Sequence, residues 1–222
     1  MKKLVLAAIL GLGVFGMLGV ASLNAAENLS KEQFVQFVVD CLDNENVRSC
    51  QRLANSGDLT SAEQCNKEAC NNIGLVYYAA ENYQQAFKYY KKACELNDKF
   101  GCFNLGVMYA EGQGVRQDFA SARKYYEKAC NANNTAACDK LGLLYYDGKG
   151  VRQDFASAKK YWEKACNKND ALACGMLGVL YYEGQGVKQN LSTAKQYYGK
   201  ACDLGSQNGC DNYKILNEQG VK

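Results

Sequence analysis

Apolar positions recur with helical spacing over most of the chain. Leu105 and Tyr109 lie four residues apart, which places both side chains on one face of a helix. Gly112 and Gly114 follow and favour a turn, because glycine adopts positive φ without steric cost. A second apolar face then appears with spacings of three and four residues, formed by Ala122, Tyr125, Tyr126 and Ala129. The pattern predicts a unit of two helices joined by a glycine turn.

This unit recurs with a period of 36 residues. Each cysteine of the series Cys94, Cys130, Cys166 and Cys202 lies 36 residues from the next. The segment VRQDFASA occurs twice without change, at 115–122 and 151–158. An earlier copy begins at Cys70 and is four residues shorter in the turn. A repeat of this length is typical of stacked helix pairs. We therefore expect an all-α fold, a right-handed α-solenoid.

The cysteines mark where the repeats begin. We expect a capping region with a degenerate repeat at 26–69, four repeats at 70–101, 102–137, 138–173 and 174–209, and a capping half-repeat at 210–222. The second helix of each repeat opens with an aspartate or asparagine, side chains that suit the N-cap because they accept from free backbone N–H groups. These expected caps are Asn82, Asp118, Asp154 and Asn190.

Paired cysteines lie at the junctions between repeats. One cysteine lies at the end of the second helix of a repeat, and the other lies at the start of the first helix of the following repeat. Their spacing is C-x7-C, so a short turn brings the two sulfur atoms within bonding distance. We expect the pairs Cys94–Cys102, Cys130–Cys138, Cys166–Cys174 and Cys202–Cys210. The same logic, with different spacing, predicts Cys41–Cys50 and Cys65–Cys70. Each bridge should restrict the unfolded chain by about 2–3 kcal/mol.

The N-terminal segment has the layout of an export signal. A basic start at Lys2 and Lys3 precedes an apolar run over 4–20 and small residues up to Ala26. We expect a signal peptide at 1–25, a secreted or periplasmic protein, no membrane contact after cleavage, and oxidised cysteines. The alternative is an uncleaved membrane anchor, for which the apolar run is short.

Composition excludes several functions. The chain has no His, so neither a Ser-His-Asp nor a Cys-His catalytic site can form, and the usual zinc-hydrolase ligand sets are missing. Lys plus Arg number 26 against 23 acidic residues, which gives no electrostatic case for nucleic acid. We expect no cofactor, no metal and a monomer.

The pattern LGxxYxxGxGVxxD…A…YYxKAC resembles the Sel1-like repeat, a relative of the tetratricopeptide repeat. With C-x7-C at each junction and an export signal, the chain resembles the Helicobacter cysteine-rich protein family over about residues 30–217. Members of this family are exported and are often named β-lactamases or penicillin-binding proteins. The resemblance implies a weak hydrolase linked to antibiotic resistance, a penicillin binder, or a secreted factor that engages the host.

The residues give little support for hydrolysis. Serine β-lactamases use S-x-x-K together with S-D-N and K-T-G, and only the first motif occurs in this chain. Its copies are Ser121–Lys124, Ser157–Lys160 and Ser192–Lys195. All three occupy one register of the second helix, so a solvated helix face is the favoured interpretation. The sequence therefore assigns no catalytic residues to a hydrolase.

Two further patterns have a packing interpretation and a binding one. The tyrosine pairs 89–90, 125–126 and 197–198 could stack on bases or sugars, but their helical spacing favours packing. The G-x-G turns could hold a phosphate, but they follow no strand, so a turn within the repeat is favoured.

A binding surface is expected on the first helices, which line the concave side of related repeats. Residues that differ between repeats at that surface could recognise a partner, or could simply tolerate drift. The candidates are Asn71, Asn72, Phe103, Asn104, Asp139, Lys140 and Met176. The favoured hypothesis is a non-enzymatic module that binds a peptide, a peptidoglycan fragment, a β-lactam or a host protein. A slow β-lactamase and a structural periplasmic adaptor are the alternatives.

Overall fold

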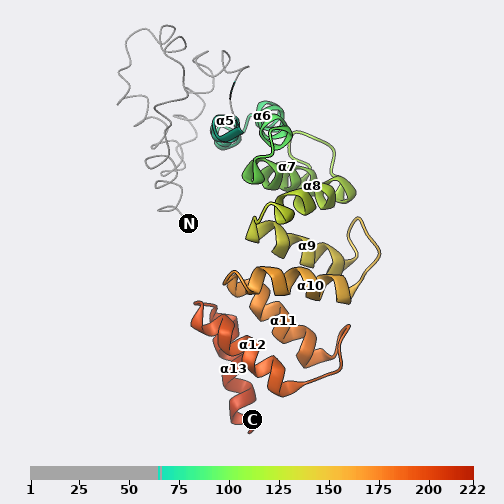
Figure 1. Cartoon of the computed structure of the whole chain (residues 1–222), viewed down its shortest axis with the longest axis vertical. Coiled ribbons are helices and arrows are strands. Elements are labelled where there is room, and N and C mark those ends of the chain that lie inside the picture. Colours follow the sequence, from blue (N-terminus) through green and yellow to red (C-terminus); the bar gives the residue numbers. More distant parts are fainter. Residues whose placement is uncertain (1–64, 66) are drawn as a thin grey trace, which may run out of the picture. The chain divides into compact units, whose positions relative to one another are not determined.

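The computed structural model describes residue 65 and residues 67–222 (Figure 1). This part of the chain is all-α, as predicted, and contains no strand. Its helices are α5 (Lys67–Ala79), α6 (Tyr83–Glu95), α7 (Lys99–Glu111), α8 (Phe119–Asn131), α9 (Thr135–Asp147), α10 (Phe155–Cys166), α11 (Ala171–Glu183), α12 (Leu191–Asp203) and α13 (Gln207–Glu218). The predicted signal peptide and the Cys41–Cys50 pair lie outside the described residues. None of the described helices is both long and apolar enough to cross a membrane.

The helices belong to two compact units. Unit 1 ends at Gln117 and holds α5–α7, and unit 2 begins at Asp118 and holds α8–α13. Within each unit, helices that follow one another in sequence pack together (Figure 1). The odd-numbered helices are the first helices of the predicted repeats. They also contact each other, α5 with α7 in unit 1 and α9 with α11 and α11 with α13 in unit 2.

Each second helix begins at the predicted cap. The Asp118 carboxylate accepts from Ala120 N at 2.9 Å and from Ser121 N at 3.2 Å, and Asn190 Oδ1 accepts from Thr193 N at 3.0 Å. The first helices are capped in the same way by residues that sequence reasoning did not single out, namely Asp98, Asn134, Asp170 and Ser206. A cap of this kind stabilises a helix by about 1 kcal/mol.

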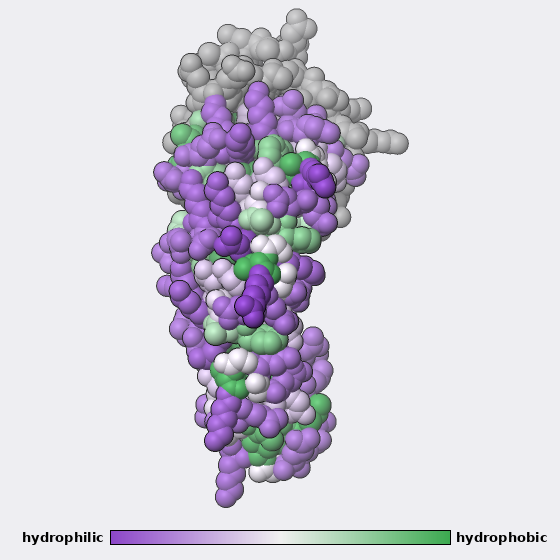
Figure 2. Space-filling model, turned by 90° about the vertical axis from the view of Figure 1, so that its right-hand side faces the viewer, coloured by the Kyte–Doolittle hydropathy of each residue, from purple (hydrophilic) through white to green (hydrophobic). Residues whose placement is uncertain are grey.

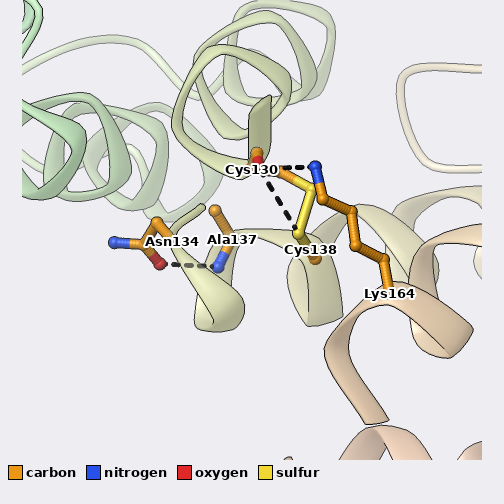
Figure 3. The surroundings of a disulfide bond; sticks show 5 residues. All are labelled: Cys130, Asn134, Ala137, Cys138 and Lys164. Carbon is orange, nitrogen blue, oxygen red and sulfur yellow. Dashed lines mark hydrogen bonds between the residues drawn. A yellow bond between two sulfur atoms is a disulfide. The ribbon is translucent and has the colours of Figure 1, made fainter. Parts of the chain in front are cut away.

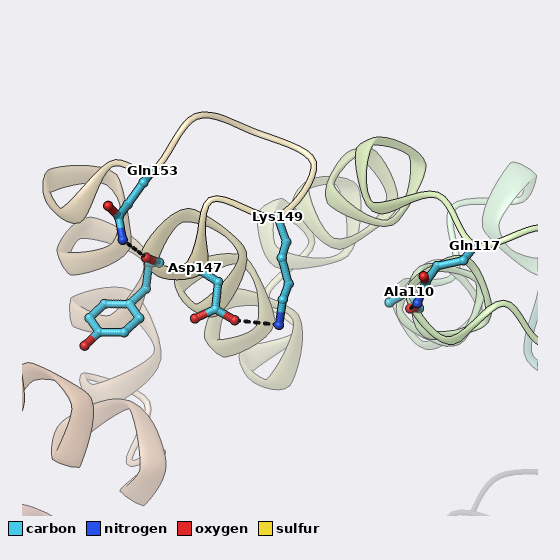
Figure 4. A network of polar contacts seen from close by, with 6 residues as sticks. Ala110, Gln117, Asp147, Lys149 and Gln153 are labelled. Carbon is cyan, nitrogen blue, oxygen red and sulfur yellow. Dashed lines mark hydrogen bonds and ion pairs between the residues drawn. The ribbon is translucent and has the colours of Figure 1, made fainter.

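The glycine turns are closed by hydrogen bonds and by packing. In the second of them, Gly148 and Gly150 have φ of 69° and 67°, and a Cβ on Gly150 would overlap the backbone of Phe119 at the start of α8. The Gln153 side chain donates to Tyr146 O at 2.7 Å, and Gln117 donates to Ala110 O at the same distance (Figure 4). These contacts account for both glycines of the turn without a bound phosphate.

Large aromatic rings of the second helices fill the core by lying on glycines of the first helices. Trp162 and Tyr198 are 0% and 4% exposed, and a Cβ on Gly142 or Gly178 would overlap them. The neighbouring tyrosines stack on tyrosines of the first helices, and in unit 2 the Tyr145–Tyr161 centroids lie 5.5 Å apart. Packing therefore explains the tyrosine pairs, as the helical spacing predicted.

The structure confirms five of the predicted disulfides. Cα–Cα distances run from 4.4 to 5.3 Å in the bridges Cys65–Cys70, Cys94–Cys102, Cys130–Cys138, Cys166–Cys174 and Cys202–Cys210. Figure 3 shows how the Cys130–Cys138 bridge is connected to the next repeat. Lys164 Nζ of that repeat donates a hydrogen bond to Cys130 O at 2.7 Å. The last four bridges each tie a second helix to the first helix that follows it, and Cys65–Cys70 ties the residue before α5 to that helix.

Candidate functional site

The three Ser–Lys motifs do not form Ser–Lys pairs. Ser121 Oγ donates to Asp118 Oδ2 at 2.6 Å, and Ser157 Oγ donates to Asp154 Oδ2 at the same distance. These hydroxyls therefore support the helix caps, and the bonds from Ser157 lower the pKa of Asp154. A serine held by a cap carboxylate is not positioned for deprotonation by a lysine.

The lysines of these motifs lie over aromatic rings instead. Lys124 Nζ is 5.7 Å from the centroid of Tyr125, and Lys160 Nζ is 5.9 Å from that of Tyr161. Lys195 Nζ donates to Asn217 Oδ1 at 2.9 Å and also lies over a ring of α13. The placement agrees with the predicted solvated helix face.

In unit 1, the predicted binding residues include an amide pair that joins two first helices. Asn104 Nδ2 of α7 donates to Asn71 Oδ1 of α5 at 3.0 Å. Asn71 is only 8% exposed, so its amide contributes mainly to holding the helices together. Asn72, Phe103 and Asn104 are half-buried and lie at the surface of unit 1.

In unit 2, the predicted residues lie on α9 and α11 next to apolar side chains that sequence reasoning missed. Lys140 and Met176 are half-buried at matching positions of the two helices. Leu143 and Val179 follow three residues later, on the same helix faces. Leu143 is 38% exposed, and Val179 packs partly against the core of α12 and α13. We call Lys140, Leu143, Met176 and Val179 the recognition face.

The repeat pattern contained a sign of Leu143 and Val179, the two residues that sequence reasoning missed. The register of Leu143 and Val179 is apolar in every copy, as Leu75, Val107 and Ile215 show. Only some repeats expose the side chain at this position. Leu143 and Ile215 are 38% and 48% exposed, and the sequence alone does not reveal this difference between repeats. Figure 2 shows one side of the molecule, on which hydrophilic residues predominate and apolar residues form small separate patches.

Asp139 lies beside the recognition face in an unusual electrostatic environment. Burial raises its pKa, and the Asp170 carboxylate raises it further, while Lys140 and the Trp162 indole N–H oppose the shift. Asp170 is the N-cap of α11 and accepts from Ala173 N at 2.9 Å. Trp162 Nε1 is buried, and the Asp139 carboxylate is the polar group beside it. Residues of α10 and α11 thus contribute to the electrostatic environment of Asp139 on α9.

Among the residues that the structure describes, no cluster of three or more His, Cys, Asp or Glu side chains could hold a metal ion. The cysteines of this region are all in disulfides. The site therefore offers charge, amide groups and apolar surface, which are the elements of binding.

Comparison with known families matches repeat models to most of the described region. The Sel1 repeat model matches residues 100–134, 135–170 and 171–206. The tetratricopeptide repeat model matches residues 67–100, over α5 and α6. The matched segments cover the region in which the period of 36 residues was found.

Individual proteins are similar over different lengths. "Putative beta-lactamase HcpC" of Helicobacter pylori is 48% identical over 56 residues, which is 25% of this chain and 19% of HcpC. The match therefore spans about a fifth of that relative's length. Helicobacter pylori cysteine rich protein B is 38% identical, over 59% of this chain and 93% of the other, with a TM-score of 0.47. A Sel1 repeat protein from Oxalobacter formigenes is 29% identical, over 79% of this chain and 85% of the other, with a TM-score of 0.62.

Proposed function

This chain belongs to the Helicobacter cysteine-rich family of Sel1-repeat proteins, and from that premise we propose that it is an exported protein that binds an extended peptide on its first helices. Five disulfides in the described region support export, because such bonds persist outside the reducing cytoplasm. The peptide can be a free one, the stem peptide of a peptidoglycan fragment, or an exposed segment of a host protein.

The recognition face is the observation that carries this proposal. The core positions of α9 and α11 repeat with little change, as Leu141 and Leu177 do, whereas Lys140 and Met176 differ at the surface. α9 and α11 contact each other, so these two positions of one register lie on adjacent helices. A strip of mixed apolar and charged groups on a rigid scaffold suits an extended peptide, whose side chains give specificity.

Hydrolysis of β-lactams is the second candidate, and it rests on the name of HcpC. The serines of the three S-x-x-K motifs support helix caps or lie exposed, and none is paired with its lysine. A serine hydrolase needs a nucleophile within hydrogen-bond reach of a base. The described region therefore favours binding over acyl transfer.

The test of binding is selection of peptides from a random phage-displayed library on the oxidised protein, followed by fluorescence anisotropy with a selected peptide. The triple change Lys140→Ala, Leu143→Ala and Met176→Ala should weaken binding at least about tenfold, as loss of an anchor cluster does. The matched control is Ser157→Ala with Lys160→Ala on α10, which should leave affinity unchanged. Equal affinity of the triple variant and the native chain would refute the recognition face.

The test of hydrolysis is turnover of a chromogenic cephalosporin at high protein concentration. We expect none above background. Turnover that disappears when Ser121, Ser157 and Ser192 are all replaced by alanine would refute a purely binding role. Thermal unfolding of each variant, monitored by circular dichroism, separates loss of function from loss of fold.

A further inference from the structure

An apolar row crosses the first helices of unit 2. It consists of Leu143 of α9, Val179 of α11 and Ile215 of α13, each 36 residues from the next. Because α11 contacts both α9 and α13, the row runs over adjacent helices. Leu143 and Ile215 are exposed, and Val179 is half-buried. Each of three successive repeats therefore presents one apolar side chain at the surface.

The spacing of the row follows from helix packing. Helices in contact lie about 8–10 Å apart between their axes, so equivalent side chains of successive repeats recur at about that interval. A β-strand returns side chains to one face after two residues, or about 6.8 Å, and would lose register with the row. A polyproline II helix rises about 3.1 Å per residue with three residues per turn, so its side chains return to one face after about 9.3 Å. The polyproline II period therefore matches the row.

The row offers side chains but no backbone partners. Leu143, Val179 and Ile215 lie within helices, where the backbone N–H and C=O groups bond inside the helix. A peptide that binds as a β-strand needs an exposed sheet edge to satisfy its own backbone. A polyproline II peptide does not, because its backbone makes no internal hydrogen bonds and stays solvated. The helical surface therefore favours the polyproline II conformation.

An exposed aromatic ring lies beside the row. Tyr182 follows Val179 by three residues, which places both on one face of α11, and the Tyr182 ring is exposed. Domains that recognise polyproline II segments use surfaces lined with aromatic rings. Tyr182 thus provides a surface of the kind on which a proline packs.

The charges around the row are mostly negative. Positions three or four residues from the row lie on the same helix faces, and their charged residues are Asp139, Asp147, Glu183, Asp211, Glu218 and Lys140. Lys149 pairs with Asp147, and Lys214 pairs with Glu218. Three carboxylates are left against one ammonium group, so lysine or arginine in a ligand would complement this surface.

We propose that the apolar row binds a polyproline II segment that has an apolar residue at every third position and basic residues between them. The inference rests on the proposed function, since it specifies the conformation and the sequence of the bound peptide. Successive apolar side chains of the segment contact Leu143, Val179 and Ile215, while a proline packs on Tyr182. The segment is already ordered before it binds, which lowers the entropic cost of binding on a narrow strip.

The test uses two labelled nine-residue peptides of identical composition and the oxidised full chain. The first repeats Leu-Pro-Lys three times, so that leucine occupies every third position. The second has the order Leu-Lys-Leu-Pro-Leu-Lys-Pro-Lys-Pro, in which the leucines are two residues apart. Fluorescence anisotropy should show at least about tenfold tighter binding of the first peptide, because only its three leucines share the period of the row. Equal affinity of the two peptides would overturn the inference.

Variants of the row show whether the leucines of the first peptide contact it. Replacing either terminal leucine by alanine should weaken binding to the native chain about tenfold. For one of the two ends this loss should disappear in Ile215→Ala, because both changes remove the same contact. Leu172→Ala is the matched control, since Leu172 is an exposed leucine of α11 outside the row, and it should leave affinity unchanged. Undiminished losses at both ends in Ile215→Ala would contradict the proposed contacts.

The outcomes separate this inference from the proposed function. If phage selection yields peptides that depend on the recognition face but lack apolar residues at every third position, the polyproline II inference is wrong and peptide binding stands. If no peptide is selected and neither designed peptide binds, the proposed function and the inference are both wrong.

Discussion

Lys164 of α10 donates a hydrogen bond to the carbonyl oxygen of Cys130 in α8, so each of these residues contributes to joining two successive repeats. The Nζ–O distance is 2.7 Å and the bond is partly buried. Cys130 is itself bonded to Cys138 in α9. Three helices of unit 2 therefore meet at one peptide group.

Replacing Lys164 by methionine should lower the free energy of unfolding by about 1.5–3 kcal/mol, because a hydrogen bond from a charged donor is lost while the apolar stem is kept. Lys200 occupies the same register in α12 and makes no corresponding bond to Cys166 within unit 2. Lys200→Met is therefore the control and should change stability by less than about 0.5 kcal/mol. Urea denaturation of the oxidised proteins measures both, and equal losses would contradict the prediction.

Gly142 should not tolerate a side chain. A Cβ at this position would overlap Trp162 Nε1, so Gly142→Ala should destabilise the protein by about 1–3 kcal/mol through overpacking. Gly175 of α11 offers the comparison, since the nearest atom to its added Cβ is Ala201 Cβ at 4.0 Å. Gly175→Ala should be neutral or stabilise by up to about 1 kcal/mol, because alanine favours helices. Similar unfolding curves for the two variants would show that the packing of Trp162 is wrong.

The disulfides should connect neighbouring cysteines in order along the chain. Peptide mapping of the oxidised protein should return the five described pairs, and Cys41–Cys50, which lies outside the described residues, as the sixth. Serine replacement of both Cys130 and Cys138 should lower stability by about 2–3 kcal/mol, since the bridge restricts the unfolded chain. Bridges between distant repeats would be incompatible with the fold described above.

Stability should fall in alkali because of buried tyrosine. Burial, followed by nearby Glu183 and Tyr182, raises the pKa of Tyr198 to about 12, whereas tyrosine in an unfolded chain titrates near about 10. The contribution of this neutral phenol is fully present below pH 10 and is lost as pH rises toward 12. Tyr198→Phe should flatten that part of a stability–pH curve, and Tyr213→Phe, at an exposed ring, should not. An unchanged slope in Tyr198→Phe would contradict the assignment.

Sequence reasoning reached the fold and the bridges because the period of 36 residues places equivalent residues in register. The N-cap aspartates and the C-x7-C pairs are local, and spacing alone constrains them. The Asn104–Asn71 and Lys164–Cys130 bonds join residues 33 and 34 positions apart, across repeats. A repeat pattern identifies which residues are equivalent, but the distance between stacked repeats decides which of them meet.

The candidate site was predicted only in part for the same reason. Asp139 and Lys140 were found because they differ between repeats, but the indole of Trp162 beside Asp139 was not. In the sequence, Trp162 looks like any other aromatic core residue. The structure shows that it packs on Gly142 and that its indole N–H lies beside the Asp139 carboxylate. In the Ser–Lys motifs, by contrast, the sequence suggested a catalytic role that the structure does not support. The Ser121 hydroxyl donates a hydrogen bond to the N-cap residue Asp118 and so supports the helix cap.

The contact of Gly150 with the start of α8 also constrains how such a chain can lengthen. Because the turn of one repeat rests on the backbone of the repeat before it, an insertion within the turn would break that contact and alter the spacing of the stack. Copying a complete repeat leaves every such contact intact. Growth by whole-segment duplication, which the two identical VRQDFASA stretches record, is therefore the route that this architecture permits.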